Sequence, residues 1–125
     1  KKLLCNGGLY SGLHKKVKKD MNSEELLNFI SEEKIGRYVY DEVSHELKIV
    51  IEINGDYWHA NPKKYNKNQK IAYPKGIIEA QEVWAKDDKK IGFAESLGFI
   101  VYVLWEQDVH NGSHLPILRR IKNGG

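Results

Sequence analysis

Residues 49–59 have the sequence IVIEINGDYWH, and this stretch decides the fold. Its first half is an almost continuous β-branched run, which is typical of a strand that is covered on both faces. Asn54 and Gly55 end that strand. Glu52 interrupts the apolar run, and a carboxylate buried there without a partner would cost several kcal/mol of folding free energy. We therefore expect a cation beside Glu52, either a metal ion or a lysine.

A helix is predicted near the start of the chain. Ser11 is expected to cap a helix that begins near Gly12. The apolar face of this helix carries Leu13, Val17 and Met21, which recur at helical spacing. The first ten residues are expected to be flexible.

The segment between this helix and the central strand contains strand patterns. Residues 23–27 could begin another short turn of helix, and residues 29–31 could form a first strand. Residues 38–43 alternate as a strand does. Residues 44–46 suit a turn, and residues 47–53 form the central strand.

A loop, a long helix, a strand and a short helix are predicted after His59. Residues 60–75 hold Asn, Pro and Lys without an apolar period, so they are expected to be a loop. Pro74 stands near the start of a long helix, and Gly98 is expected to end it. The apolar stripe of this helix is Ile77, Ile78, Ala80, Val83, Trp84, Ile91, Ala94 and Leu97. Residues 99–105 form another buried strand, and residues 115–121 suit a short closing helix.

These elements predict an α/β fold in which a small mixed β-sheet is flanked by helices. The strand–helix–strand order favours a right-handed parallel crossover. The chain of 125 residues fits a single domain, residues 1–125, which could also be a fragment of a longer protein.

Composition narrows the class of protein. The single cysteine, Cys5, excludes a disulfide framework and a zinc site built on several thiolates, and it suits a reducing intracellular compartment. No apolar run approaches the roughly 20 residues that span a bilayer. The net charge is +3, a mild indication of a polyanionic partner. Two lysine clusters stand out, and each could equally be solvated surface. They are Lys15, Lys16, Lys18 and Lys19, and Lys63, Lys64, Lys67 and Lys70.

Carboxylates on neighbouring strands suggest a metal site. Asp41 lies on the strand that precedes Glu52, so the two side chains can converge on one ion. The carbonyl of Ile53 could be a third ligand. Mg²⁺ prefers such oxygen ligands. Taken singly, Asp41 could be a turn residue, and Glu52 could be paired with a lysine.

His59 follows the carboxylates and could transfer protons near neutral pH. Alone, it could be a surface loop histidine, and Asp56 could simply form a turn. Asp87 and the neighbouring Asp88 look like ordinary exposed helix charges. A further pair, His110 and His114, is expected to lie in a surface loop, since no other ligand cluster supports zinc there. Phosphate-loop, dinucleotide and Gly-x-Ser-x-Gly motifs are absent from the sequence.

Three blocks of the sequence stand together: residues 37–41 (RYVYD), residues 49–59, and residues 87–106, which contain an LGF turn at 97–99 and a strand that ends in LWE at 104–106. These blocks resemble the Vsr-like branch of the PD-(D/E)XK nuclease superfamily. This branch includes very-short-patch repair endonucleases and phage or intron-associated homing endonucleases described by an EDxHD motif. The resemblance extends from Ser11 to about Asp108.

The resemblance implies roles for several residues. Asp41 would be the main metal ligand, joined by Glu52 and the Ile53 carbonyl, with Mg²⁺ as the ion and Mn²⁺ as a substitute. Asp87 would orient His59 or a water. Tyr57 and Trp58 correspond to aromatic residues that wedge into DNA in the repair enzymes, although Trp58 could instead belong to the core.

The sequence departs from the family at two positions. Asn54 stands where the superfamily often has lysine, and it cannot act as a base, so proton transfer should shift to His59. His14 stands where relatives often carry a helix glutamate, and a plain helix-surface histidine is the alternative. The cysteine and histidine set that binds zinc in the repair enzymes is absent from the sequence, so no zinc is expected.

The expected function is Mg²⁺-dependent hydrolysis of phosphodiester bonds in double-stranded DNA, by an intracellular nuclease of the homing or mobile-element type in a phage or bacterial context. Lys63, Lys64, Lys67 and Lys70 would contact phosphates, and Asp56 is an additional candidate. A homodimer or an added DNA-recognition domain is compatible with this function. The alternatives are a non-catalytic nucleic-acid-binding domain with the same fold, a mismatch-repair nicking enzyme, and a nuclease for RNA or single strands.

Overall fold

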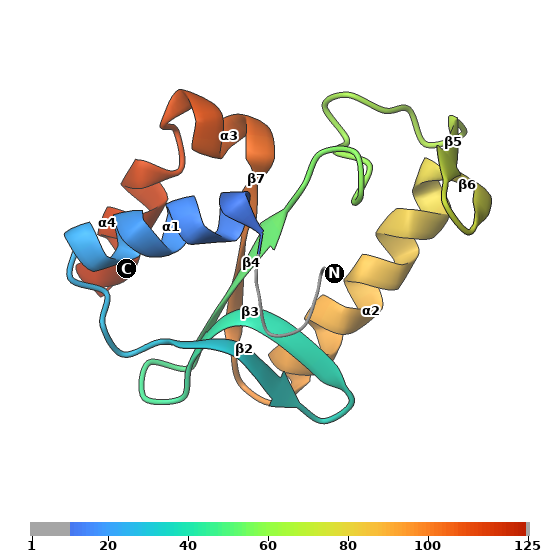
Figure 1. Ribbon diagram of the computed structural model, residues 1–125. Coiled ribbons are helices and arrows are strands. Elements are labelled where there is room, and N and C mark those ends of the chain that lie inside the picture. The colour runs from blue at the N-terminus through green and yellow to red at the C-terminus, as the bar shows by residue number, and fades with distance from the viewer. Residues whose placement is uncertain (1–10, 125) are drawn as a thin grey trace.

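The computed structural model describes residues 11–124. Residues 1–10, which include Cys5, lie outside the described part. A four-stranded mixed sheet with the order β2-β3-β4-β7 forms the centre of the molecule (Figure 1). Its strands are β2 (Ile30–Ile35), β3 (Tyr38–Ser44), β4 (Ile49–Asn54) and β7 (Ile100–Trp105).

The predicted parallel crossover is confirmed. β4 pairs in parallel with β7, from Ile49 opposite Ile100 to Asn54 opposite Trp105. The helix α2 (Ala80–Ser96) lies between these two strands in the sequence. β3 is antiparallel to both β2 and β4. Every residue of β4 is buried, as expected for a strand covered on both faces.

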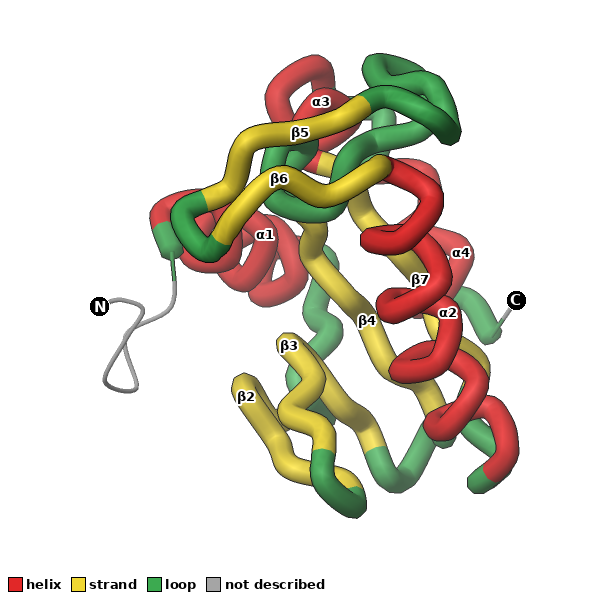
Figure 2. Tube along the Cα trace, turned by 90° about the vertical axis from the view of Figure 1, so that its right-hand side faces the viewer, coloured by secondary structure: helices red, strands yellow, loops and turns green. Residues whose placement is uncertain are grey.

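Helices cover both faces of the sheet, so the predicted α/β fold is confirmed. On one face α1 (Gly12–Ser23) and α4 (Leu115–Lys122) pack against the isoleucines of β4, with Val17, Met21 and Leu118 in the shared core. On the other face α2 contributes Ala94 to a second core with Val50. Figures 1 and 2 show these two helical layers on opposite sides of β4 and β7.

The first helix begins as predicted, but no further helical turn follows it at residues 23–27. The Ser11 side chain accepts a hydrogen bond from the backbone N–H of His14, which caps α1. α1 ends at Ser23, so the helical turn expected at residues 23–27 is wrong. Glu25 has a φ of +61°, and the backbone N–H of Leu26 bonds to Met21 O at 2.8 Å. This reversal returns the Leu26 side chain to the core.

A second sheet was missed by the sequence analysis. Strands β5 (Lys70–Tyr73) and β6 (Gly76–Glu79) form a hairpin within and after the expected loop (Figure 2). The long helix therefore begins at Ala80, not near Pro74. Ile77 and Ile78 lie in β6, where Ile77 is 72% exposed. The Glu82 side chain accepts the backbone N–H of Glu79, and this contact belongs to the cap that starts α2.

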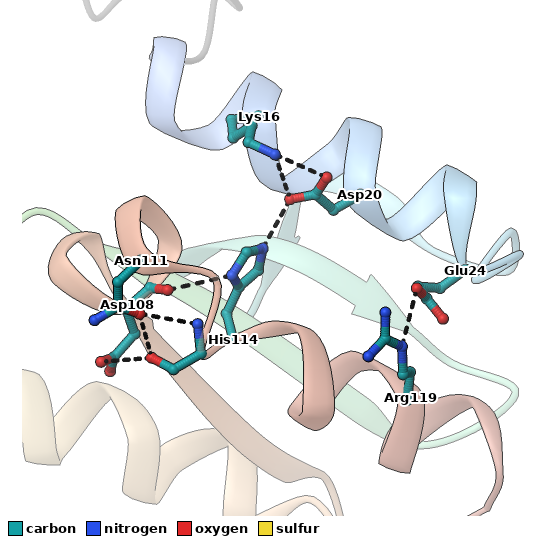
Figure 3. Close-up of polar contacts among 8 residues, drawn as sticks. Lys16, Asp20, Glu24, Asp108, Asn111, His114 and Arg119 are labelled. Carbon is teal, nitrogen blue, oxygen red and sulfur yellow. Dashed lines mark hydrogen bonds and ion pairs between the residues drawn. The ribbon is translucent and has the colours of Figure 1, made fainter.

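The C-terminal part contains one more helix than predicted. α3 (Glu106–Asn111) directly follows β7, and the predicted closing helix is α4. His114 between them is 1% exposed, so its expected place in a surface loop is wrong. Its Nε2 lies 2.7 Å from Asp20 Oδ2 of α1, and this contact fastens α1 to the C-terminal helices (Figure 3).

Within residues 11–124, the helices are too short and too polar to cross a membrane.

Candidate active site

Asp41 and Glu52 meet where β3 and β4 separate. The backbone pairing of these strands ends at Glu42 opposite Ile51. Beyond that point carboxylate oxygens replace backbone carbonyls as acceptors. The Asp41 N–H donates to Glu52 Oε1 at 2.8 Å, and the Ile53 N–H donates to Asp41 Oδ2 at 2.7 Å. The three residues expected to hold the metal ion therefore contact one another.

Glu52 is buried and has a lysine partner. Lys90 Nζ of α2 lies 2.7 Å from Glu52 Oε2. Burial raises the pKa of Glu52 and the charge of Asp41 raises it further, whereas Lys90 lowers it. Of the two alternatives for the cation beside this carboxylate, a metal ion or a lysine, the lysine is present.

Lys90 was not among the predicted site residues, although its place on the apolar stripe of α2 indicates a buried partner. Lys90 lies seven residues after Val83 and four before Ala94, on the apolar stripe of α2. A lysine on such a stripe needs a buried acidic partner. The backbone oxygen of Lys90 accepts a hydrogen bond from the Tyr40 hydroxyl at 2.6 Å, and Lys90 Nζ lies 5.0 Å from the Tyr40 ring centroid. Burial, together with the charge of Glu52, raises the pKa of Tyr40 to about 12.

His59 and Asp87 form the contact that the sequence analysis expected. His59 Nδ1 lies 2.9 Å from Asp87 Oδ2, and both side chains are partly exposed. A carboxylate on Nδ1 holds one tautomer and directs Nε2 outward for proton transfer. Asp87 and Lys90 are three residues apart on α2, about 4.5 Å along its axis, so one helix face supplies partners to both His59 and Glu52.

Asp56 fixes the loop that carries His59. It is buried, and its Oδ1 accepts Asn61 Nδ2 at 2.9 Å, while Lys64 Nζ lies 2.9 Å from Oδ2. Burial would raise the pKa of Asp56, but the contacts with Asn61 and Lys64 hold it below its usual value. The Asp56 N–H also donates to Glu106 Oε1. Asp56 therefore has the turn-forming position that the sequence analysis considered.

Aromatic side chains beside His59 form an exposed cluster. Trp58 is 58% exposed, so its alternative place in the core is wrong. Its ring is stacked on Tyr73 of β5 with centroids 6.1 Å apart, and Tyr57 lies edge-on to Trp58 at 4.9 Å. An open groove of about 770 Å³ is lined by Trp58, His59, Tyr73 and α2 residues that include Asp87.

His14 is buried, so its alternative place on the helix surface is wrong. Its Nε2 lies 2.6 Å from Glu42 Oε2. Glu42 is fully buried and also accepts Lys18 Nζ at 2.8 Å and the Ser31 hydroxyl at 2.5 Å. Burial would raise the pKa of Glu42, but these contacts hold it below its usual value.

The remaining predicted residues lie around this site. Asn54 is buried at the end of β4, opposite Trp105. Lys63 and Lys67 are exposed in the loop after His59, and Lys70 is exposed at the start of β5.

No family model matches the chain, and no curated protein matches it significantly. Among solved structures, the catalytic domain of the homing endonuclease I-Bth0305I has a similar fold, with a TM-score of 0.58 and 16% sequence identity. The match covers 92% of this chain and 94% of that domain. The mixed sheet flanked by helices is therefore the fold of a homing endonuclease catalytic domain.

Proposed function

We propose that the chain is a metal-dependent DNA endonuclease of the homing or mobile-element type, with a Vsr-like, PD-(D/E)XK active site. The observation that carries this proposal is the meeting of Asp41, Glu52 and Ile53 where β3 and β4 separate. The similarity of fold to a homing endonuclease catalytic domain supports it.

The residues at this point fit a divalent cation such as Mg²⁺. Asp41, Glu52 and the carbonyl of Ile53 would hold it, since all three offer oxygen atoms. Burial, and to a smaller extent the charge of Asp41, raises the pKa of Glu52. A divalent cation beside the two carboxylates would favour their ionised forms. When bound, the cation supplies Lewis acidity and charge neutralisation at the scissile phosphate.

His59 would move the proton. With Asp87 on Nδ1, its Nε2 would take a proton from the attacking water or give one to the leaving oxygen. Lys90 would keep Glu52 ionised and in place. Asn54 has no basic group, so the proton-transfer role rests on His59.

The surface around His59 would bind double-stranded DNA. Lys63, Lys64, Lys67 and Lys70 would contact phosphates, which gives affinity without sequence selection. Tyr57 and Trp58 would stack on bases, because exposed aromatic rings offer a face to any base. Lys64 would keep its contact with Asp56 while doing so.

The test is cleavage of supercoiled plasmid in Mg²⁺ or Mn²⁺. We expect Asp41→Asn and Glu52→Gln to slow cleavage about 100-fold or more, because each removes a charged group from the site. The matched control is Glu33→Gln, which changes a β2 carboxylate paired with His45. Cleavage by both site variants at the wild-type rate would overturn the proposed site.

DNA binding measured separately distinguishes the alternatives. Tight binding of duplex DNA without cleavage in either ion would identify a non-catalytic binding domain. A panel of duplex, mismatched, single-stranded DNA and RNA substrates identifies a repair nickase or a nuclease of another substrate class.

A further inference from the structure

Three side chains from three elements converge beside the proposed site. His14 of α1, Glu32 of β2 and Asp41 of β3 each offer one ligand atom, and these atoms all lie within 4.8 Å of one another. We propose that they form one metal site that selects Mn²⁺ over Mg²⁺. The proposal rests on the proposed function for the role of the ion and deepens it by naming Glu32 and His14 as ligands.

The two carboxylates of this cluster lie close together on neighbouring strands. Glu32 falls opposite Asp41 in the β2–β3 register, between the pairs Ser31–Glu42 and Glu33–Tyr40. Within residues 11–124, neither Glu32 nor Asp41 forms an ion pair. Two negative charges this close repel each other, and a divalent cation between them removes that repulsion.

His14 has the surroundings of a metal-bound histidine. Such a histidine usually donates its other ring N–H to a carboxylate, which fixes the ring and raises the basicity of the binding nitrogen. Glu42 Oε2, 2.6 Å from His14 Nε2, is placed as that carboxylate. Glu42 is in turn held by Lys18 and Ser31. Binding of the ion through Nδ1 would keep the contact with Glu42.

The donor set decides which ion is preferred. Mg²⁺ takes oxygen ligands in a near-ideal octahedron, and an imidazole nitrogen is a poor member of that set. Mn²⁺ takes carboxylate ligands as Mg²⁺ does, but as a first-row transition ion it accepts an imidazole nitrogen more readily than Mg²⁺ does. One imidazole with two carboxylates therefore suits Mn²⁺, and we expect its dissociation constant to be at least about ten-fold below that of Mg²⁺.

Metal binding without DNA tests the proposal. The metal-free chain is titrated with Mn²⁺ while electron paramagnetic resonance measures the free ion, and Mg²⁺ is added as competitor. We expect one tight Mn²⁺ per chain. Glu32→Gln should weaken binding at least about ten-fold. Glu32 is exposed, so this variant should fold. Glu33→Gln, the matched control on the same strand, should bind as the wild type does.

The histidine has a spectroscopic test. Pulsed electron paramagnetic resonance of bound Mn²⁺ should detect a hyperfine coupling to nitrogen, and His14→Gln should abolish this coupling. Wild-type affinity in Glu32→Gln, absence of nitrogen coupling in the wild type, or tighter binding of Mg²⁺ would each overturn the proposal. Mn²⁺ binding that depends on Glu32 and His14, in a chain that does not cleave DNA, would support this site and contradict the nuclease function. DNA cleavage together with unchanged Mn²⁺ affinity in Glu32→Gln would support the nuclease function and contradict this metal site.

Discussion

Lys90 Nζ lies 2.7 Å from Glu52 Oε2, so a helix residue balances the carboxylate that interrupts the central strand. Asp87, three residues earlier on α2, contacts His59 in the same way. The parallel crossover places α2 over the face of β4 that carries Val50 and Glu52. One helix therefore positions the proposed metal-side carboxylate and the proposed proton carrier together.

A double-mutant cycle should detect the Lys90–Glu52 pair. Lys90→Met should lower the free energy of unfolding by about 2 kcal/mol, because it leaves a buried carboxylate without its cation. In the Glu52→Gln background the same change should cost much less. Urea unfolding measures both, and Lys89→Met is the control because Lys89 is exposed. Equal costs in the two backgrounds would mean that the pair contributes nothing.

The His59–Asp87 contact predicts non-additive kinetics. His59→Ala should slow DNA cleavage by about 10²–10⁴-fold, since it removes the proton carrier. Asp87→Asn should slow it less, and it should add little to His59→Ala because Asp87 acts through His59. Single-turnover cleavage rates measure this, with Asp88→Asn as the exposed control. If Asp87→Asn slowed cleavage as much in the His59→Ala background as in the wild type, Asp87 would have a role separate from His59.

The fold was predictable from the sequence where one periodicity dominated. The β-branched run before Asn54 predicted a strand covered on both faces, and β4 is buried throughout. The family resemblance implied that Asp87 orients His59 or a water, and Asp87 contacts His59. The β5–β6 hairpin was missed because Ile77 and Ile78 also match the helical spacing of α2. Lys90 and Glu32 were missed for another reason. Their partners are distant in sequence, and only the crossover and the β2–β3 register bring them to Glu52 and Asp41.

The Asp20–His114 contact predicts a loss of stability in acid. Burial would raise the pKa of Asp20, but hydrogen bonds with His114 and Lys16 hold it below its usual value of 3.8. The stabilisation, about 1–2 kcal/mol, should thus be fully present above pH 3.8 and be lost as the pH falls through the folded pKa. Urea unfolding of wild type and Asp20→Asn should differ at pH 6 (about two units above the usual Asp pKa) and converge in acid. For the exposed control Asp88→Asn, the difference from the wild type in free energy of unfolding should not change in this way with pH.

The exposed lysines predict the salt dependence of DNA binding. Removal of one phosphate-binding lysine should make the slope of log K against log salt concentration shallower by about 0.9. We expect Lys67→Ala and Lys70→Ala to do so equally for unrelated DNA sequences, because phosphates carry no sequence information. Fluorescence anisotropy over a salt series measures the slope. Lys34→Ala, an exposed lysine on β2, should leave it unchanged.

Gly36 and Gly92 predict opposite changes in stability. Gly36 turns the chain between β2 and β3 with a φ of +62°, and a Cβ there would lie 2.6 Å from the Phe93 ring of α2. Gly36→Ala should therefore lower the free energy of unfolding by about 1–2 kcal/mol. Gly92 lies inside α2, where a Cβ meets nothing within 4 Å, so Gly92→Ala should raise it by about 0.5–1 kcal/mol. Thermal unfolding gives both signs. A neutral Gly36→Ala would contradict both the backbone strain at this φ and the close approach of the Phe93 ring.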